Sequence, residues 1–336
     1  AADVKMVAAE VPSAVPQVVL KVLLRDFRDH VRELGRRVAE VVLVESRERQ
    51  ARLEEALRLF VPRGVDVVVI NKVKLNGETL GEDPTVRLIC IAATGYDNID
   101  LNYCRAHGIG VANVAGYSTQ SVAQVTVAMA LSLYTHLPQY TAYVKSGAYS
   151  RGSVANKLEP AYHEIAGKTW GIIGYGNIGR AVGTVAEALG CRVIVNKRTP
   201  VPGAACVDID TLCREADIIS VHTPLNSETR GLINAARLAE MKKGTVLINV
   251  ARGAVMDEAA VAAAVKSGHL GGLGVDVYSS EPFPKEHPFT EIADCPNVCL
   301  TPHMAWGAYE ARVRCLAEIV ENIRAFARGE RRSRVD

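Results

Sequence analysis

A glycine-rich stretch near the middle of the chain constrains the fold more than any other feature. The mostly apolar run Thr169–Ile173 leads into the pattern Gly174-x-Gly176-x-x-Gly179, after which apolar residues recur at helical spacing. A strand, a glycine turn and a helix in this order are typical of a dinucleotide site, where the glycines permit a tight turn, close approach of a pyrophosphate and close helix–strand packing. The helix N-terminus would face the phosphates with free N–H groups and the positive end of its dipole.

The composition is that of an ordinary globular protein. The 336 residues are 49% hydrophobic and 23% charged, which is long enough for two domains. A net charge of +2 gives no basis for binding nucleic acid or an anionic membrane. Residues 1–24 are interrupted by Glu10, Pro12, Pro16 and Lys21, so we expect neither a signal peptide nor a membrane span there.

The eight cysteines are expected to be reduced thiols in a cytoplasmic protein. None of them forms a Cys-x-x-Cys pair, and most lie in apolar surroundings, where cysteine behaves as a small hydrophobic residue. Cys295 and Cys299 are the nearest pair, but they lack a partnering Cys/His pair. The sequence therefore predicts no metal site.

Short apolar runs alternate with amphipathic stretches, which predicts parallel α/β structure. Strands are expected first at Val19–Leu24, Val41–Val44, Val67–Ile70, Leu88–Ala92 and Gly110–Val114, with a helix at Ser46–Leu59. Later strands are expected at Thr169–Ile173, Arg192–Val195, Ile218–His222, Thr245–Val250, Gly272–Val277 and Val298–Thr301, with helices at Asn177–Leu189, Ala235–Met241 and Glu258–Ser267. A last helix, Gly307–Arg328, follows and is expected to return to the first domain. The prediction is an α/β chain of two doubly wound parallel-sheet domains, the second a Rossmann domain inserted in a discontinuous first.

The segment between the two sets of strands predicts an interface. Ser121 and Gln124 fit a capping box that opens a long helix, with Ser118 as the alternative cap. Apolar residues cover more than one face of this helix, so its own domain or a partner subunit must cover it. Tyr140–Glu164 has weak periodicity and four tyrosines, which predicts an irregular arm. These features favour a homodimer.

Six separated motifs, in the same order, resemble those of the D-isomer-specific 2-hydroxyacid dehydrogenases. They are Ala92–Asp100, Asn113–Thr119, the glycine turn, Ile248–Ala254, Gly274–Pro282 and Thr301–His303. Asn71–Val73 and His303–Trp306 look most like the glycerate dehydrogenase/hydroxypyruvate reductase branch of that family. The resemblance implies a flavodoxin-like substrate domain, residues 1–117 and 306–336, and a cofactor domain, residues 118–305.

The resemblance assigns the catalytic roles to Arg252, Glu281 and His303, each of which follows an expected strand end. A guanidinium offers a carboxylate a fixed fork of donors, and an imidazole can donate a proton in one direction and accept it in the other. A carboxylate such as Glu281 would hold the ring and favour its protonated form. Taken singly, the three would be a surface arginine, a turn residue and a loop histidine, but their joint occurrence in matching flanks favours catalysis. The remaining histidines are interpreted as structural: His30, His107, His136, His163, His222, His269 and His287.

The resemblance also implies substrate and cofactor contacts. The backbone N–H groups of Thr94, Gly95 and Tyr96 would bind the substrate carboxylate, with a simple turn as the competing interpretation. Lys72 either faces the cleft or solvates a loop, and Asp276 either lies near the nicotinamide or caps a turn. The implied cofactor contacts are Gly174, Gly176, Asn177, Ile178, Gly179, Asn196, Lys197, Arg198, Thr199, Thr223, Pro224, Val250, Ala251 and Asp276.

The end of the second strand of the cofactor domain favours NADP(H) over NAD(H). An NAD site places an acidic residue about twenty positions after the glycine turn to bind the ribose 2′-hydroxyl. Here the sequence Asn196-Lys197-Arg198-Thr199 holds no carboxylate and two bases, and Arg198 could pair with a 2′-phosphate. Two solvated bases in a turn before Pro200 are the alternative, so NAD(H) stays possible.

The sequence therefore predicts an NAD(P)-dependent enzyme that reduces a small 2-keto acid, such as hydroxypyruvate or glyoxylate, to D-glycerate or glycolate. Formate- and phosphite-type dehydrogenases of the same family are alternatives. A cofactor-sensing regulatory protein of this fold is another, although the chain has no long basic tail to recruit partners. The loops around Asp26 and Phe27 align too poorly to give the pocket size, so the substrate's identity stays open.

Overall fold

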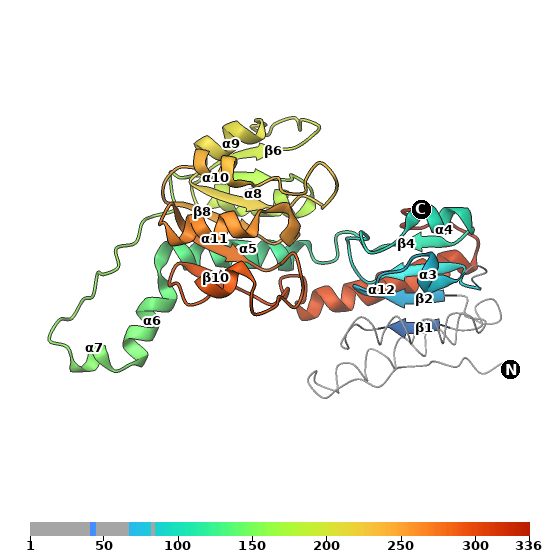
Figure 1. The fold of residues 1–336 in the computed structure, drawn as a ribbon, viewed down its shortest axis with the longest axis horizontal. Helices are drawn as coiled ribbons and strands as arrows, with labels where there is room; N and C mark the ends of the chain where they lie inside the picture. The colour runs from blue at the N-terminus through green and yellow to red at the C-terminus, as the bar shows by residue number, and fades with distance from the viewer. Residues whose placement is uncertain (1–40, 45–66, 82–84) are drawn as a thin grey trace. The chain divides into compact units, whose positions relative to one another are not determined.

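The computed structural model describes residues 41–44, 67–81 and 85–336. The chain divides into two compact units (Figure 1). The first runs to Tyr117 and resumes at Tyr309–Asp336, and the second is the continuous segment Ser118–Ala308. The second unit thus ends at Ala308 rather than at the residue 305 expected from the sequence.

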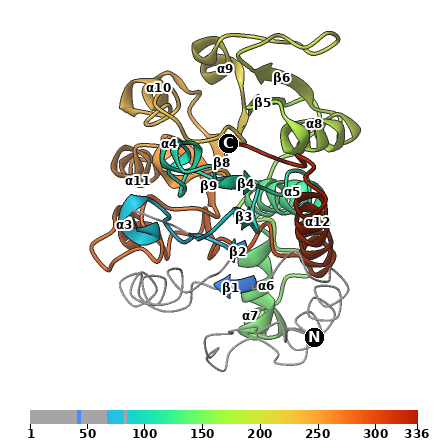
Figure 2. The ribbon, with the colours of Figure 1, turned by 90° about the vertical axis from the view of Figure 1, so that its right-hand side faces the viewer.

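The first unit contains a parallel sheet with strand order β1-β2-β3-β4. Its strands are β1 (Val41–Val44), β2 (Val67–Ile70), β3 (Leu88–Ile91) and β4 (Gly110–Ala112). Every side chain of β2 and β3 is buried, as expected for strands covered on both faces. Helices α3 (Gly77–Leu80) and α4 (Leu101–Ala106) lie on one side of the sheet, and α12 (Tyr309–Ala327) packs against β3 on the other (Figure 2).

Apolar runs located the strands of this unit well. β1 and β2 have the expected bounds, β3 is one residue shorter than expected, and β4 is two residues shorter. Helix α12 begins at Tyr309 rather than Gly307. The strand expected at Val19–Leu24 and the helix expected at Ser46–Leu59 lie outside the described residues, as do Asp26 and Phe27.

The second unit contains a six-stranded parallel sheet with order β10-β9-β8-β7-β5-β6. The strands are β5 (Thr169–Ile173), β6 (Arg192–Asn196), β7 (Ile218–Val221), β8 (Thr245–Asn249), β9 (Leu270–Val275) and β10 (Val298–Leu300). From β5 the chain moves outward to β6 and then returns to the other side of β5 to form β7. The strand order therefore reverses at β5, and ligands of open α/β sheets bind beyond the carboxyl ends of strands at such a point.

Helices cover both faces of this second sheet, which confirms a doubly wound α/β unit. Helices α5 (Thr119–Thr135) and α8 (Asn177–Ala188) pack on one face around Trp170 and Ile172. Helices α9 (Ile209–Glu215), α10 (Ala235–Glu240) and α11 (Glu258–Lys266) pack on the other, around Ile219 and Leu247 (Figure 2). Two short 3₁₀ helices, η2 (Gly253–Val255) and η3 (Pro288–Ile292), follow β8 and β9.

The expected strands and helices of the second unit agree with the structure to within two residues, but α9 was not expected. The capping box at Ser121 is wrong, because α5 begins earlier, at Thr119. The Ser121 hydroxyl donates instead to the carbonyl oxygen of Ala305. Ser118 occupies the N-cap position, but its side chain makes no capping hydrogen bond.

The tyrosine-rich segment is more regular than expected. Helix α6 (Leu137–Lys145) and helix α7 (Ala148–Arg151) replace the first part of the arm, and only Gly152–Glu164 has neither helix nor strand. Both helices lie away from the sheet of their unit (Figure 1), and neither buries a side chain. No helix in the described part of the chain is long and apolar enough to cross a membrane.

Candidate active site and cofactor turn

The three glycines of the turn after β5 differ in what a side chain at each position would contact. Gly174 has a φ of +92°, and a Cβ there would lie 2.6 Å from the backbone nitrogen of Thr223. A Cβ on Gly179 would lie 2.3 Å from the carbonyl oxygen of Gly174, so a glycine is needed for α8 to start against the strand. A Cβ on Gly176 would meet nothing within 4 Å. The outer side of the turn is therefore open, and it exposes Gly176 and Asn177 at the start of α8, which fits a bound pyrophosphate.

The remaining predicted cofactor residues lie at the same edge of the sheet. Asn196 ends β6, its side-chain amide donates to the carbonyl oxygen of Val207 at 3.1 Å, and its own carbonyl accepts from Gly174 N at 2.9 Å. Thr223 and Pro224 follow β7, and Val250 and Ala251 follow β8. Since parallel strands end at one edge, the sheet brings all of these segments to the side on which the glycine turn lies.

Lys197 and Arg198 are both exposed beyond the end of β6. The Arg198 guanidinium lies 3.8 Å from the carboxylate of Glu228, and the two side chains are 85% and 72% exposed. An ion pair this long and this exposed contributes little, so it leaves Arg198 able to take another anion. Glu228 is nevertheless a carboxylate close to the place where a 2′-phosphate is expected.

His303 and Glu281, two of the predicted catalytic residues, are in direct contact. His303 Nδ1 lies 2.7 Å from Glu281 Oε2 and 2.9 Å from Oε1, with side chains 20% and 25% exposed. The carboxylate also accepts from Tyr278 N at 3.0 Å. This contact is consistent with a proton on Nδ1 and fixes the ring plane, so Nε2 is the ring nitrogen that could exchange a proton with a substrate.

Asp276 holds the loop that carries His303. Its carboxylate is 1% exposed, and Oδ1 accepts from Thr301 Oγ1 at 2.6 Å and from Met304 N at 2.8 Å. Its second oxygen accepts from Ala305 N at 2.9 Å. These contacts match the alternative interpretation, in which Asp276 caps a turn. They lie on both sides of His303, whose own φ is 51°. A position near the nicotinamide stays a prediction.

Arg252 lies three residues beyond the end of β8, on a turn fixed by Asn249. Asn249 is 0% exposed; its side chain accepts from Ala251 N at 3.0 Å and donates to the carbonyl oxygen of Arg252 at 2.9 Å. A Cβ on Gly253 would lie 2.0 Å from the carbonyl carbon of Tyr278, so the Arg252 turn packs against the backbone that precedes Glu281. The sequence analysis gave Asn249 no role of its own, although it lies in the motif Ile248–Ala254. The available signal was an amide directly after an apolar strand.

His222, which the sequence left as structural, lies at the same edge. A Cβ on Gly174 would lie 2.7 Å from the His222 carbonyl carbon, so this residue packs against the glycine turn. Its Nε2 lies 3.0 Å from Ser220 Oγ, which also accepts from Trp170 Nε1 at 2.9 Å. Burial lowers the pKa of His222 to about 3, so the ring is neutral near neutral pH.

The predicted substrate residues lie on the first unit. Lys72 follows β2 with a φ of 59° and is exposed, while Thr94, Gly95 and Tyr96 follow the neighbouring strand β3. Thr94 Oγ1 donates to Val114 O at 3.1 Å, and Tyr96 is 39% exposed. Both segments leave the carboxyl edge of the small sheet, and their part in substrate binding stays a prediction.

All eight cysteines are free thiols. Within residues 41–44, 67–81 and 85–336, no group of three or more His, Cys, Asp or Glu side chains is placed to hold a metal ion.

Comparisons with known proteins show which family this chain resembles. Residues 127–305 match the family model described as D-isomer specific 2-hydroxyacid dehydrogenase, NAD binding domain. Glycerate dehydrogenase of Methylorubrum extorquens is 37% identical over 268 residues, which cover 80% of this chain and 84% of the relative. Hydroxypyruvate reductase of Thermotoga maritima is 33% identical over 306 residues, covering 88% and 97%.

A solved structure extends the similarity to the fold. The D-lactate dehydrogenase of Aquifex aeolicus, complexed with NAD and lactic acid, superimposes with a TM-score of 0.79 at 30% identity and 94% coverage of both chains. The family model and the relatives together cover both units. The chain therefore belongs to the D-isomer specific 2-hydroxyacid dehydrogenase family, and it is an oxidoreductase with a nicotinamide-binding Rossmann domain.

Proposed function

We propose that this chain reduces a small 2-keto acid, with hydroxypyruvate and glyoxylate as leading substrates, to the corresponding D-2-hydroxy acid with NADPH. The observation that carries the proposal is the 2.7 Å contact between His303 and Glu281 at the carboxyl edge of the second sheet. Arg252 follows β8, two strands from the strand that precedes His303. The names of the relatives support the substrate class.

In this proposal each side chain has one task. The bound nicotinamide supplies the hydride that reaches the carbonyl carbon. His303 in its protonated form donates the Nε2 proton to the carbonyl oxygen and becomes neutral imidazole. Glu281 stabilises the imidazolium before transfer and holds the ring through Nδ1. Arg252 holds the substrate carboxylate with its guanidinium fork and remains charged throughout.

Oxidation of NADPH by a panel of keto acids from glyoxylate to phenylpyruvate tests this function. We expect His303→Gln and Arg252→Ala each to lower kcat/KM for hydroxypyruvate by roughly a thousandfold while the circular dichroism spectrum stays unchanged. Arg214→Ala, on an exposed arginine that pairs with Glu240 on α10, is the control and keeps full activity. Absence of turnover across the whole panel would contradict the proposal and favour a cofactor-sensing regulator.

The preference for NADPH rests on Lys197, Arg198 and the missing carboxylate after β6. We expect Arg198→Ala to raise KM for NADPH about tenfold and to leave KM for NADH nearly unchanged, because only NADPH carries the 2′-phosphate. Glu228→Gln removes the carboxylate 3.8 Å from Arg198 and lowers KM for NADPH. A wild-type kcat/KM that is higher with NADH than with NADPH would contradict this assignment.

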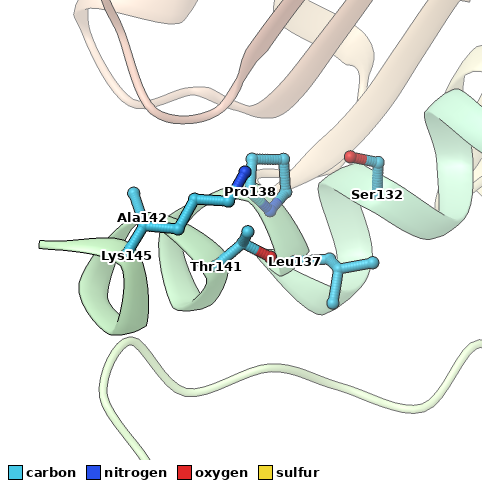
Figure 3. A pocket seen from close by; sticks show the side chains of 6 residues that line it. All are labelled: Ser132, Leu137, Pro138, Thr141, Ala142 and Lys145. Atoms are coloured by element: carbon cyan, nitrogen blue, oxygen red, sulfur yellow. The ribbon is translucent and has the colours of Figure 1, made fainter. Parts of the chain in front are cut away.

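We also propose that a second copy of the chain covers α6. This helix buries none of its side chains, and its apolar residues Leu137 and Val144 are 61% and 55% exposed, so both face solvent in a single chain. A cavity of about 400 Å³ opens beside it, lined by Ser132, Leu137, Pro138, Thr141, Ala142 and Lys145 (Figure 3). A symmetric pair of such helices would bury these apolar side chains.

Light scattering coupled to size exclusion tests the dimer. We expect a dimer for the natural chain and a folded monomer for the double variant Leu137→Glu/Val144→Glu. Val313→Glu, at another exposed valine, on α12, is the matched control and stays dimeric. A natural chain that elutes as a monomer at micromolar concentration would overturn the proposal.

A further inference from the structure

A second carboxylate–imidazole pair lies buried behind the turn that carries Glu281. Glu258, in the first turn of α11, is 8% exposed, and His287, just before η3, is 6% exposed. His287 Nε2 lies 3.0 Å from Glu258 Oε2. Neither residue belongs to the catalytic or cofactor residues described above.

The hydrogen bonds of this pair converge on Ser279. Glu258 Oε1 accepts from Ser279 N at 2.9 Å, and Oε2 accepts from the Ser279 hydroxyl as well as from His287. His287 Nδ1 accepts from Phe289 N at 3.2 Å, which places the proton of a neutral ring on Nε2, facing the carboxylate. Three donors thus satisfy one buried carboxylate, the arrangement that makes a buried charge tolerable.

These contacts are not needed to start α11. Asp257 is the N-cap of that helix, and its side chain accepts from Ala260 N at 3.0 Å. The carboxylate of Glu258 instead accepts hydrogen bonds from outside the helix, from the backbone N–H and the hydroxyl of Ser279. Two aromatic rings lie beside His287, whose ring centroid is 4.8 Å from that of Phe283 and 5.1 Å from that of Phe289.

Ser279 is the residue next to the backbone group that holds Glu281. Tyr278 N donates to Glu281 Oε1 at 3.0 Å, and Glu281 in turn holds His303 Nδ1. Helix α11 is therefore linked to His303 by successive contacts. Glu258 binds Ser279, Ser279 is covalently joined to Tyr278, and Tyr278 N binds Glu281, which contacts His303. The Arg252 turn packs against the same Tyr278–Ser279 backbone at Gly253.

We infer that Glu258 and His287 are positioning residues that fix the Ser279–Glu281 turn and thereby hold Glu281 on His303. The inference rests on the proposed function, because it deepens the account of the same acid–base site. A displacement of Glu281 by a fraction of an ångström weakens its hold on the imidazole and lowers the efficiency of proton donation, without touching substrate or cofactor directly.

Two substitutions test this inference, and they differ in how many of the hydrogen bonds they disturb. Glu258→Gln keeps the size of the side chain but presents an amide NH₂ where one carboxylate oxygen accepted, and Ser279→Ala removes only the hydroxyl donor. We expect both to lower kcat by about 10- to 100-fold, to change KM for NADPH little, and to displace the pH profile of kcat. Ser279→Thr keeps a hydroxyl and restores most of kcat.

Glu291→Gln is the matched control, because Glu291 on η3 also pairs with α11, through Lys266, but at the surface. It leaves both kcat and the pH profile unchanged. The proton on His303 Nδ1, followed by NMR, gives a readout that needs no turnover: its hydrogen-bonded signal shifts in Glu258→Gln and Ser279→Ala and stays in Glu291→Gln.

The two proposals fail in different ways. A natural chain without turnover contradicts the proposed function, and the NMR signal still decides the positioning role. An active natural chain whose Ser279→Ala and Glu258→Gln variants keep the natural kcat, pH profile and His303 signal overturns the inference. A loss of kcat in proportion to unfolded protein, with an unchanged pH profile, overturns it as well.

Discussion

At the scale of single residues, two glycines of the same turn are expected to affect different properties: Gly179 the stability of the fold, and Gly176 the binding of the cofactor. Gly179→Ala places a methyl group 2.3 Å from the Gly174 carbonyl oxygen, so we expect it to destabilise the second unit by about 1–3 kcal/mol. Gly176→Ala meets no protein atom within 4 Å, so it leaves the melting temperature unchanged but weakens NADPH binding by about tenfold or more, because the methyl group faces the phosphates. Thermal melting and fluorescence titration measure the two effects, and a Gly176→Ala variant that binds NADPH normally would contradict the assignment.

His222 makes stability depend on pH. Its folded-state pKa of about 3 lies below the ordinary 6.5, so between these values the unfolded chain binds a proton that the folded chain does not. The stability linked to His222 is complete above pH 6.5. Below that pH the free energy of unfolding declines as pH falls, by at most about 1.4 kcal/mol per pH unit. We expect His222→Asn to flatten this decline in urea unfolding followed from neutral pH to about pH 5. His136→Asn, at a left-handed helix end that suits asparagine, is the control and keeps the natural slope.

The sequence was enough to propose Arg252, Glu281 and His303 as catalytic residues, a proposal that stays a prediction. It did not point to the residues that hold the Glu281 turn. Arg252, Glu281 and His303 stand in flanks that resemble a known family, and each follows a strand end. Glu258 and His287 carry no such local signal, because their partners lie 21 and 29 residues away along the chain. Contacts of this kind exist only once the sheet has brought separate turns together, so the sequence left His287 as a structural histidine.

At the scale of elements, burial decides what a sequence pattern reveals. The strands could be predicted because most are short, nearly continuous apolar runs. Strands β5, β7 and β8 are buried along their whole length, as strands covered on both faces are. Helix α6 was not predicted as a separate helix. None of its side chains is buried, so the exposed residues Leu137 and Val144 do not form the wide apolar stripe of a core-facing helix. Helix α9 was missed for a different reason, since at seven residues it is too short for a clear period.

The C-terminal segment 333–336 acts as a cover for the edge of β4. Val335 N donates to Val111 O at 2.9 Å, and Val111 N donates to the Asp336 carboxylate at 2.8 Å. Burial alone would raise the pKa of Asp336, but hydrogen bonds from Arg334 and from Val111 N outweigh it and lower the pKa to about 2. The stability this carboxylate contributes is therefore present above its ordinary pKa of 3.8 and lost as pH falls through about 2.

We expect Asp336→Asn to lower the free energy of unfolding by roughly 1–2 kcal/mol at neutral pH. The difference from the natural chain should shrink below pH 3.8 and vanish near pH 2. Urea unfolding at a series of pH values measures it. Glu310→Gln, at an exposed carboxylate in the first turn of α12, is the control, and a pH-independent loss in Asp336→Asn would contradict the charge-based account.

At the scale of the whole molecule, the two units differ in how they are built. The second is one continuous segment with its own sheet, two buried clusters and the glycine turn, whereas the first needs segments from both ends of the chain. We expect residues 118–308, expressed alone, to melt cooperatively and to bind NADPH within about tenfold of the full chain. Turnover should be absent, because Thr94–Tyr96 lie on the first unit. A segment that fails to fold would mean that the second unit depends on the first.

The strand order of the second sheet also separates the residues proposed to select the coenzyme from those proposed to act in catalysis. The coenzyme-selecting bases follow β6, the glycine turn follows β5, and the catalytic residues follow β8, β9 and β10 at the far side. Five inter-strand steps separate β6 from β10, roughly 24 Å at about 4.8 Å per step, which is about three Debye lengths at physiological salt. If Lys197 and Arg198 select the coenzyme and His303 transfers the proton, as proposed, substitutions at the two bases would change coenzyme preference without an electrostatic effect on proton transfer, and each property could change in evolution on its own.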